Sequence, residues 1–112
     1  MTETEFLFVY VTAGSKEEAK AIAAEAVKKN LAACANILPS MTSVFQWQGQ
    51  VETAEETVLI LKTTRKKFAA LKQLVLELHS YDCPCITALP VSDGHSDFLD
   101  WIRSETKTPK RS

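Results

Sequence analysis

The dominant pattern in the chain is a long stretch without helical periodicity, residues 31–64 of 112. At its middle stands the turn sequence Trp47-Gln48-Gly49-Gln50, between segments rich in apolar and β-branched residues. This pattern predicts one long β-hairpin. At about 3.3 Å per residue, its second strand, residues 51–64, reaches about 45 Å, whereas a compact domain of this length is about 35 Å across. We therefore expect other copies of the chain to cover the hairpin.

The elements on either side of the hairpin have ordinary lengths. An unbroken apolar segment predicts a central strand buried on both faces, and two stretches with apolar residues at helical intervals predict amphipathic helices. In order, the pattern predicts a strand at Phe6–Val11, a helix capped by Ser15, the hairpin, a helix from near Thr64 or Arg65 to near His79, a strand at about Cys85–Val91 and a short helix from about Ser96. Val27, Leu78 and Trp101 are expected on the buried faces of the three helices.

This order of elements indicates an α+β domain with the ferredoxin-like βαββαβ arrangement, a long hairpin and an extra C-terminal helix. Both long helices then pack on one face of an antiparallel sheet, and the other face lacks a cover. Depending on register, Leu59 and Leu61 or Val58 and Ile60 point toward the uncovered face. A trimer with three sheets facing inward closes this surface, and a dimer is an alternative. Residues 1–106 are expected to form this one domain, and residues 107–112 a disordered basic tail.

The composition of the chain mainly excludes classes of protein. The chain is 46% hydrophobic with a formal net charge of −1, which indicates one globular core and provides no basic surface for nucleic acid. No apolar run approaches the length of about 18 residues that a membrane span needs, and the N-terminal residues lack the positive region of a signal peptide. Three cysteines in a chain of this size favour reduced thiols, so a cytoplasmic protein is expected.

Five short motifs carry a resemblance that spans almost the whole chain. They are Leu31-Ala-Ala-Cys-Ala-Asn36, Trp47-Gln-Gly49, Ile60-Leu-Lys-Thr-Thr64, His79-Ser-Tyr-Asp-Cys-Pro84 and Asp97-Phe-Leu-Asp-Trp101. In this order and spacing they resemble the CutA-like divalent-cation-tolerance family. The resemblance implies a small cytoplasmic homotrimer of ferredoxin-like subunits, similar in architecture to the PII signalling proteins, with a link to tolerance of copper and other divalent metals.

A cluster of metal-ligating residue types follows the second helix: His79, Asp82, Cys83 and Cys85. Pro84 favours extended backbone at this point, so the two thiols that flank it point to the same face. Thiolate ligands select Cu(I) or Zn(II), and the resembled family commonly has an acidic or small residue where this chain has Cys85. A zinc tetrahedron stays incomplete unless His79 or another subunit contributes. The alternative is that both cysteines are packing residues at the start of a strand.

A second candidate site lies at the expected junction between subunits. Lys62 alternates with apolar residues on its strand, so a carboxylate, either Glu56 or one from another chain, is expected to pair with its ammonium group. Trp47 at the hairpin tip is expected to insert into a neighbouring subunit. With Tyr81 these residues resemble the polar cluster of the family near the subunit junction, and Cys34 is assigned to the same cleft. Such a cleft could bind a small anion or metabolite, and a structural ion pair is the alternative.

Two functional hypotheses result. The first is a trimeric metal-binding or metal-responsive protein that holds a copper or zinc ion. The alternative is a PII-like regulatory or scaffolding trimer that binds a small ligand or a protein partner at the intersubunit cleft. An enzyme is not expected, because the sequence has no glycine-rich phosphate loop, no Gly-x-Ser-x-Gly and no His-Glu-x-x-His motif. No organic cofactor is expected either, and the expected partner is the chain itself.

Overall fold

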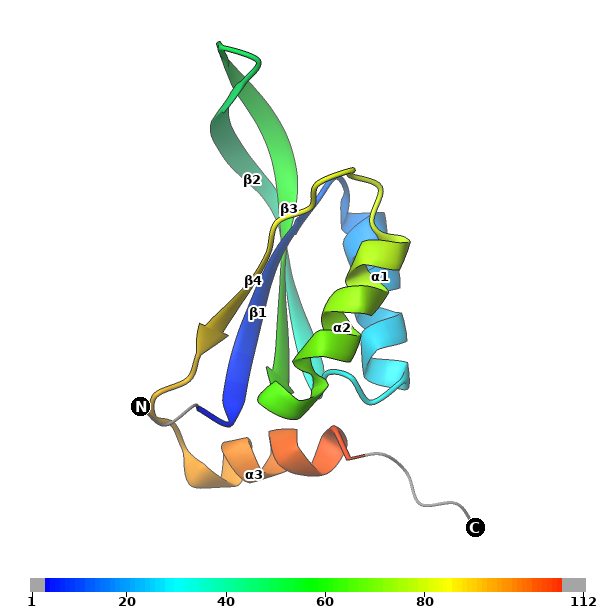
Figure 1. The fold of residues 1–112 in the computed structure, drawn as a ribbon, viewed down its shortest axis with the longest axis vertical. Coiled ribbons are helices and arrows are strands. Elements are labelled where there is room, and N and C mark those ends of the chain that lie inside the picture. Colours follow the sequence, from blue (N-terminus) through cyan, green and yellow to red (C-terminus); the bar gives the residue numbers. More distant parts are fainter. Residues whose placement is uncertain (1–3, 108–112) are drawn as a thin grey trace.

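The computed structural model describes residues 4–107. In chain order the elements are β1 (Phe6–Ala13), α1 (Lys16–Lys28), β2 (Cys34–Trp47), β3 (Gln50–Thr64), α2 (Arg65–Leu78), β4 (Ile86–Pro90) and α3 (Ser96–Glu105). The strands form one antiparallel sheet in the order β2-β3-β1-β4, with α1 and α2 on one face and α3 across one end (Figure 1). The predicted α+β class and element order are confirmed. In this part of the chain no helix is both long and apolar enough to cross a membrane.

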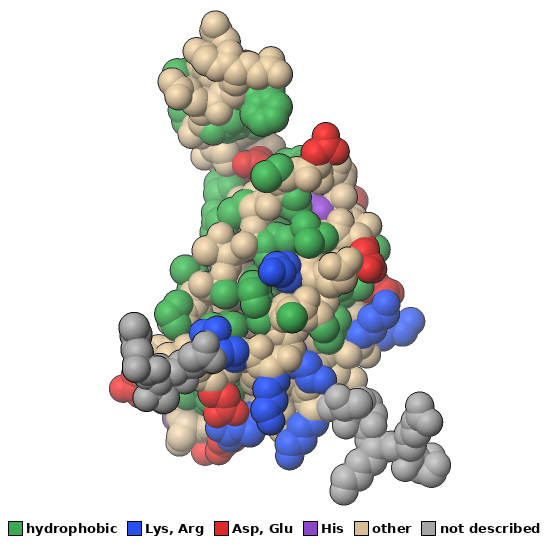
Figure 2. All heavy atoms as spheres, viewed as in Figure 1, with side chains coloured by type: hydrophobic (Ala, Val, Ile, Leu, Met, Phe, Trp, Pro, Cys, Tyr) green, Lys and Arg blue, Asp and Glu red, His purple; other side chains and the backbone are tan. Residues whose placement is uncertain are grey.

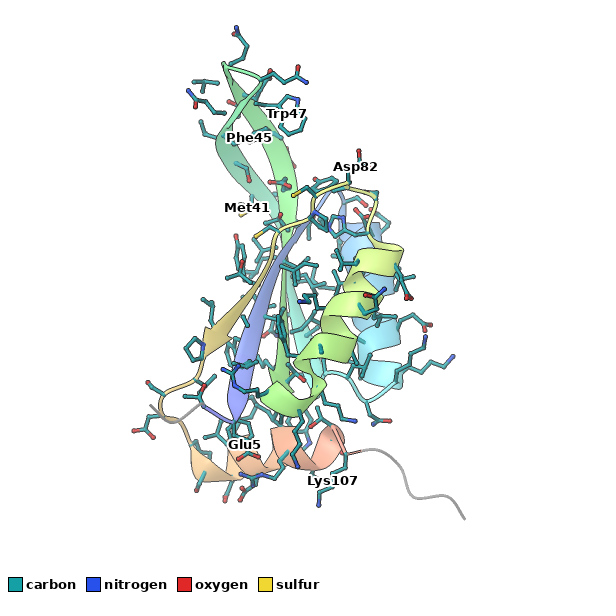
Figure 3. All side chains as sticks on the ribbon, viewed as in Figure 1. Glu5, Met41, Phe45, Trp47, Asp82 and Lys107 are labelled. Atoms are coloured by element: carbon teal, nitrogen blue, oxygen red, sulfur yellow. The ribbon has the colours of Figure 1, made fainter. Side chains whose placement is uncertain are left out.

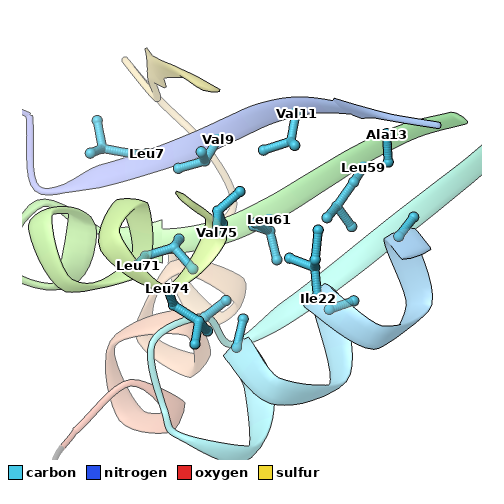
Figure 4. Close-up of a cluster of buried hydrophobic side chains, with 14 residues drawn as sticks. Leu7, Val9, Val11, Ala13, Ile22, Leu59, Leu61, Leu71, Leu74 and Val75 are labelled. Carbon is cyan, nitrogen blue, oxygen red and sulfur yellow. The ribbon is translucent and has the colours of Figure 1, made fainter. Parts of the chain in front are cut away.

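The main core lies between the sheet and the two long helices (Figure 4). Leu59 and Leu61 of β3 are fully buried there, so the strand register turns Val58 and Ile60 to the opposite face. The other large buried side chains of this layer are Leu7, Val9 and Val11 of β1, Ile22 of α1, and Leu71, Leu74 and Val75 of α2. Burying a Leu or Val side chain contributes about 1.5–3 kcal/mol relative to leaving it exposed. This layer is therefore the chief hydrophobic contribution to stability.

β1 is central in the sheet, as predicted, but its burial is one-sided. Side chains that point toward the helices, such as Val9 and Val11, are fully buried, whereas Phe8 and Tyr10 on the other face are only partly buried. The expectation of burial on both faces is wrong for the single chain, because helices cover one face alone. Val27 of α1 and Leu78 of α2 are also exposed, at the margins of their helices' apolar faces.

The predicted hairpin turn is confirmed. Gln48 and Gly49 have φ angles of 51° and 78°, which place both residues in the left-handed region. Two such residues in succession make the type I′ turn, whose twist matches that of the two strands it joins. Glycine adopts this conformation without a steric penalty, which explains its position after Gln48.

A β-bulge divides the hairpin into two parts. Pro39 and Ser40 of β2 together stand opposite Thr57 of β3, and Ser40 has a φ angle of 65°. Bulges bend a strand and increase its twist. Beyond the bulge the hairpin continues as an arm, residues 41–56, which projects from the body, and the molecule measures 51 × 35 × 22 Å (Figure 1). The predicted overhang of the hairpin is therefore present, and the chain's own helices do not cover it.

α3 closes the other end of the sheet through a small second core. Ile102 of α3 is buried there against Phe6 and Ala33. Trp101 was expected in the core, but it is 41% exposed and stacks on Phe98 with the ring centroids 5.9 Å apart, because only one side of this short helix faces the sheet. The expected basic tail, residues 107–112, lies outside the described residues except for Lys107.

Glu18 connects the start of α1 to the turn after α2. Ser15 caps α1 by accepting the Glu18 N–H at 3.1 Å, as the capping-box spacing predicts. The Glu18 carboxylate accepts the backbone N–H groups of Gly14 at 3.0 Å and of Ser80 at 2.6 Å. Burial of this carboxylate opposes its ionisation, but the hydrogen bonds from Ser80 and Gly14 outweigh that effect and lower the pKa of Glu18. The ionised carboxylate therefore stabilises the fold.

We predict that Glu18→Gln lowers the free energy of unfolding at pH 7 by about 1–3 kcal/mol, because the amide retains only one of the two accepting oxygens. The stabilisation by Glu18 is present above its ordinary pKa of 4.5 and is lost as the pH falls through the lowered value of the folded protein. Urea unfolding of both proteins from pH 7 to pH 3 measures this difference, which should shrink toward the acidic end.

Glu17→Gln is the matched control, because Glu17 precedes Glu18 in the same helical turn and is exposed. This variant should unfold like the parent protein. Equal stability of the Glu18→Gln and Glu17→Gln proteins at pH 7 would contradict the assigned role of Glu18.

Candidate functional site

The candidate site is the open face, the face of the sheet that lacks helices. Paired residues of an antiparallel sheet share a face, so the register defines its members. They are Phe8, Tyr10 and Thr12 of β1, Cys34, Asn36 and Leu38 of β2, Val58, Ile60 and Lys62 of β3, and Thr87 and Leu89 of β4. Most of these side chains are apolar or aromatic, and Leu38 is 52% exposed. A contiguous apolar surface of this kind marks an interaction site.

The arm extends the open face beyond the body. Phe45 and Trp47 share their side of the arm with Met41, while Val44 and Val51 lie on the reverse side. Trp47 is 61% exposed and Val51 is 70% exposed. The arm contains no Lys or Arg, and its hydrophobic side chains stand clear of the body (Figures 2 and 3). Both sides of the arm therefore present apolar groups that this chain alone leaves in water.

Tyr81 and Glu56 are the two predicted cleft residues that the structure brings into contact. The Tyr81 hydroxyl donates a hydrogen bond to the Glu56 carboxylate at 2.9 Å. Burial and this bond to the carboxylate raise the pKa of Tyr81 to about 12, so the phenol keeps its proton at neutral pH. Cys34 stands directly opposite Lys62 in the register, and Trp47 lies at the hairpin tip. The five predicted cleft residues thus occupy three separate positions along one face.

Lys62 does not meet Glu56 within the chain. Its ammonium nitrogen lies 5.3 Å from the ring centroid of Phe8 and 5.4 Å from that of Phe98. Glu56 is six positions away on the same strand, about 20 Å at the usual rise per residue, so that part of the prediction is wrong. The two aromatic rings stabilise the cation instead. Among residues 4–107 Lys62 has no carboxylate partner, which keeps open the predicted partner from another chain.

Both ring nitrogens of His79 form hydrogen bonds with backbone groups. Its side chain is fully buried, with Nε2 at 2.7 Å from the Thr12 carbonyl oxygen and Nδ1 accepting the Tyr81 N–H at 3.1 Å. This pair of bonds defines the form of the ring that carries its proton on Nε2. Because both ring nitrogens are engaged, His79 is not available as a metal ligand in this conformation. It positions the turn that presents Tyr81.

The remaining members of the predicted metal cluster lie on the surface of the same turn. Cys83 and Cys85 are exposed free thiols, and Asp82 is exposed at the outer side of the turn (Figure 3). Cys85 Sγ lies 3.8 Å from Thr87 Oγ1, a member of the open face. Residues 4–107 contain no group of three His, Cys, Asp or Glu side chains placed to hold one metal ion. Neither thiol packs in the core of this chain.

Met41 is a further soft-metal ligand type that the sequence pattern does not single out. Its sulfur lies 3.6 Å from the Tyr10 hydroxyl, at the base of the arm. Thioethers share the preference of thiolates for soft metal ions. Pro39 is the sequence signal that could have indicated the position of Met41. A proline inside a predicted strand indicates a β-bulge, and a bulge changes which face of the sheet the following residues occupy.

Comparison with known proteins assigns the chain to a family. The family model described as CutA1 divalent ion tolerance protein matches residues 7–105. The divalent-cation tolerance protein CutA of Thermus thermophilus is 45% identical over 98 residues, which cover 88% of this chain and 95% of the relative. The protein of the same name from Archaeoglobus fulgidus is 48% identical over 95 residues, covering 85% of this chain and 92% of that protein.

Solved structures agree with the sequence comparison. The structure of the divalent cation tolerance protein Cut A1 from Thermus thermophilus has a TM-score of 0.89 and 43% identity, covering 91% of this chain and 99% of that chain. CutA1 from Oryza sativa has a TM-score of 0.89 and 38% identity, covering 96% and 98%. The chain belongs to the CutA1 divalent ion tolerance protein family.

Proposed function

We propose that this protein acts in divalent-cation tolerance, as a non-enzymatic homotrimer that binds a copper or zinc ion. Support for the general role comes from the names of its relatives from Thermus thermophilus and Archaeoglobus fulgidus. The observation that carries the quaternary proposal is the apolar open face together with its extension along the arm. An uncovered sheet face and a long exposed hairpin both favour association with identical copies.

The distribution of apolar groups favours three copies over two. A pair of sheets packed face to face covers the open face, including Leu38, and the side of the arm that carries Phe45 and Trp47. Such a pair leaves Val44 and Val51 on the reverse side of the arm in water. A ring of three subunits gives each arm a neighbour on either side, so all of these groups lose water contact.

We predict that Leu38→Glu reduces the assembly to single chains, because a carboxylate at the centre of an apolar interface is costly to bury. Sedimentation equilibrium at micromolar concentration measures the mass, and circular dichroism establishes that the variant is folded. The parent protein should have three times the mass of one chain.

Val27→Glu is the matched control, because Val27 is also an exposed apolar residue but lies on α1, on the helix side of the sheet. This variant should keep the parent mass. A parent protein that sediments as a monomer, or a Leu38→Glu protein with the parent mass, would contradict the proposal.

The proposed metal site rests on Cys83 and Cys85 rather than on His79. Both thiols are exposed on one turn, and Asp82 is exposed beside them. Two thiolates on a short segment suit a soft cation, either Cu(I) or Zn(II). A zinc tetrahedron needs two further ligands, which Asp82 and a second subunit supply in the proposed trimer.

We predict that the double substitution of Cys83 and Cys85 by Ser weakens binding of Cu(I) by more than about tenfold, because hydroxyl oxygens replace both soft ligands. Competition with a chromophoric Cu(I) chelator measures the affinity. Cys34→Ser is the control, because Cys34 is a half-buried thiol on β2 opposite Lys62. Unchanged affinity in the double variant removes the proposed site, even if the trimer is intact.

We place the protein in the cytoplasm as part of this proposal. All three cysteines, Cys34, Cys83 and Cys85, are unpaired, which suits a reducing compartment. The structure of the Archaeoglobus fulgidus relative is described as that of a periplasmic protein. The small-ligand alternative at the Tyr81 and Glu56 contact stays a prediction.

A further inference from the structure

A pocket of about 400 Å³ is lined by residues from the first turn of α2 and the end of α3. These two helix ends lie at the end of the molecule opposite the arm (Figure 1). The lining of the pocket consists of Glu5, Thr64, Lys66, Lys67, Arg103, Thr106 and Lys107. Figure 2 shows Lys and Arg side chains gathered at this end, and Figure 3 shows Glu5 and Lys107 there. The pocket is remote from the arm and from the cysteines of the proposed metal site.

Thr64 provides the observation that points to a ligand. This residue is the N-cap of α2 and is only 5% exposed, yet its side chain does not cap the helix. Within residues 4–107 its hydroxyl group has no hydrogen-bond partner, although the residue lines the pocket. The Thr64 hydroxyl is not among the polar side-chain atoms of residues 4–107 that are both closed off from solvent and unpaired, so an oxygen atom of a ligand in the pocket can replace water as its hydrogen-bond acceptor.

The start of α2 has no side-chain cap and no acidic residue in its own first turn. This turn begins Arg65-Lys66-Lys67. In α1, by contrast, a Ser15 side chain caps the helix and Glu17 and Glu18 occupy the first turn. Positive side chains at the positive end of a helix dipole repel it, so a bound anion would relieve this repulsion. The first N–H of the helix, that of Arg65, already donates to the Glu5 carbonyl oxygen at 2.8 Å.

The one carboxylate in the lining is already neutralised. Glu5 receives two hydrogen bonds from Arg103, Nε to Oε2 at 2.7 Å and Nη2 to Oε1 at 2.9 Å. The hydrogen bond from Arg103 is the main reason that the pKa of Glu5 is lowered. Lys66 and Lys107 have no ion pair with any carboxylate of residues 4–107. The pocket therefore keeps an excess of positive charge.

We propose that this pocket binds a phosphate group. The Thr64 hydroxyl donates a hydrogen bond to a phosphate oxygen, and Lys66 and Lys107 neutralise the negative charge. A phosphate group fits these partners because its oxygens accept several hydrogen bonds and it carries more than one negative charge. The volume exceeds that of a single phosphate ion, so a small phosphate monoester also fits. None of the residues that line this pocket belongs to the proposed metal site.

Calorimetric titration of the full chain with inorganic phosphate and with glycerol 1-phosphate tests the proposal. Both probes should bind with one site per chain and raise the melting temperature, whereas glycerol and chloride at equal ionic strength should do neither. Thr64→Val and Lys66→Gln should each weaken binding about tenfold, because each removes one charge-assisted contact. Thr64→Ser retains the hydroxyl and should bind like the parent.

Lys20→Gln is the control for loss of positive charge, because Lys20 is an exposed residue of α1 outside the pocket. This variant should bind both probes like the parent protein. Tighter binding of glycerol 1-phosphate than of inorganic phosphate identifies an organic phosphate as the ligand class, and equal binding identifies the free ion.

Absence of binding by both probes at millimolar concentration would overturn the proposal. So would equal binding by the parent and Lys66→Gln proteins, or an equal loss of binding in Lys66→Gln and Lys20→Gln. If Thr64→Val does not fold, Thr64→Ser and Lys66→Gln still decide the outcome. Loss of the metal site in the Cys83 and Cys85 variant should leave phosphate binding unchanged.

Discussion

One-sided coverage of the sheet is the constraint on which the rest of this structure depends. Two helices cover one face of the four-stranded sheet, and Leu59 and Leu61 are buried between the sheet and these helices. Strict alternation along β3 then directs Val58, Ile60 and Lys62 to the other face. The same alternation continues past the bulge into the arm, so the apolar surface of the body and that of the arm are consequences of one strand register.

Local sequence signals were sufficient for most of the fold. The Gln48-Gly49 turn, the Ser15 cap and the helical apolar spacing depend on residues only a few positions apart, and the structure contains each of them. The sequence alone does not distinguish the two possible registers of the hairpin, because the pair Leu59 and Leu61 is as apolar as the pair Val58 and Ile60. The packing of α1 and α2 over one face decides between them.

The candidate sites were harder to predict because their partners are distant in the chain. His79 resembles a metal ligand in sequence, but Thr12, which is 67 positions away, occupies its Nε2 atom. Lys62 was assigned a carboxylate, whereas Phe98 on α3 provides one of its aromatic contacts. The phosphate pocket likewise exists only where the end of α3 approaches the start of α2. No spacing rule within one element contains this information.

β3 also explains how one chain can carry both the apolar arm and the cationic pocket. The strand carries Gln50 at the tip of the arm and Thr64 at the edge of the cationic pocket, and its residues span about 45 Å at the usual rise of an extended chain. The proposed contacts between copies, through the arm and the open face, therefore use different residues from those that line the anion pocket. Positively charged residues are distributed in the same way. The arm contains no Lys or Arg, whereas four cationic side chains line the pocket. An apolar arm suits association with identical copies, since like charges at a self-complementary interface would repel one another. The basic residues that line the pocket thus lie away from the arm, where they can attract a small anion.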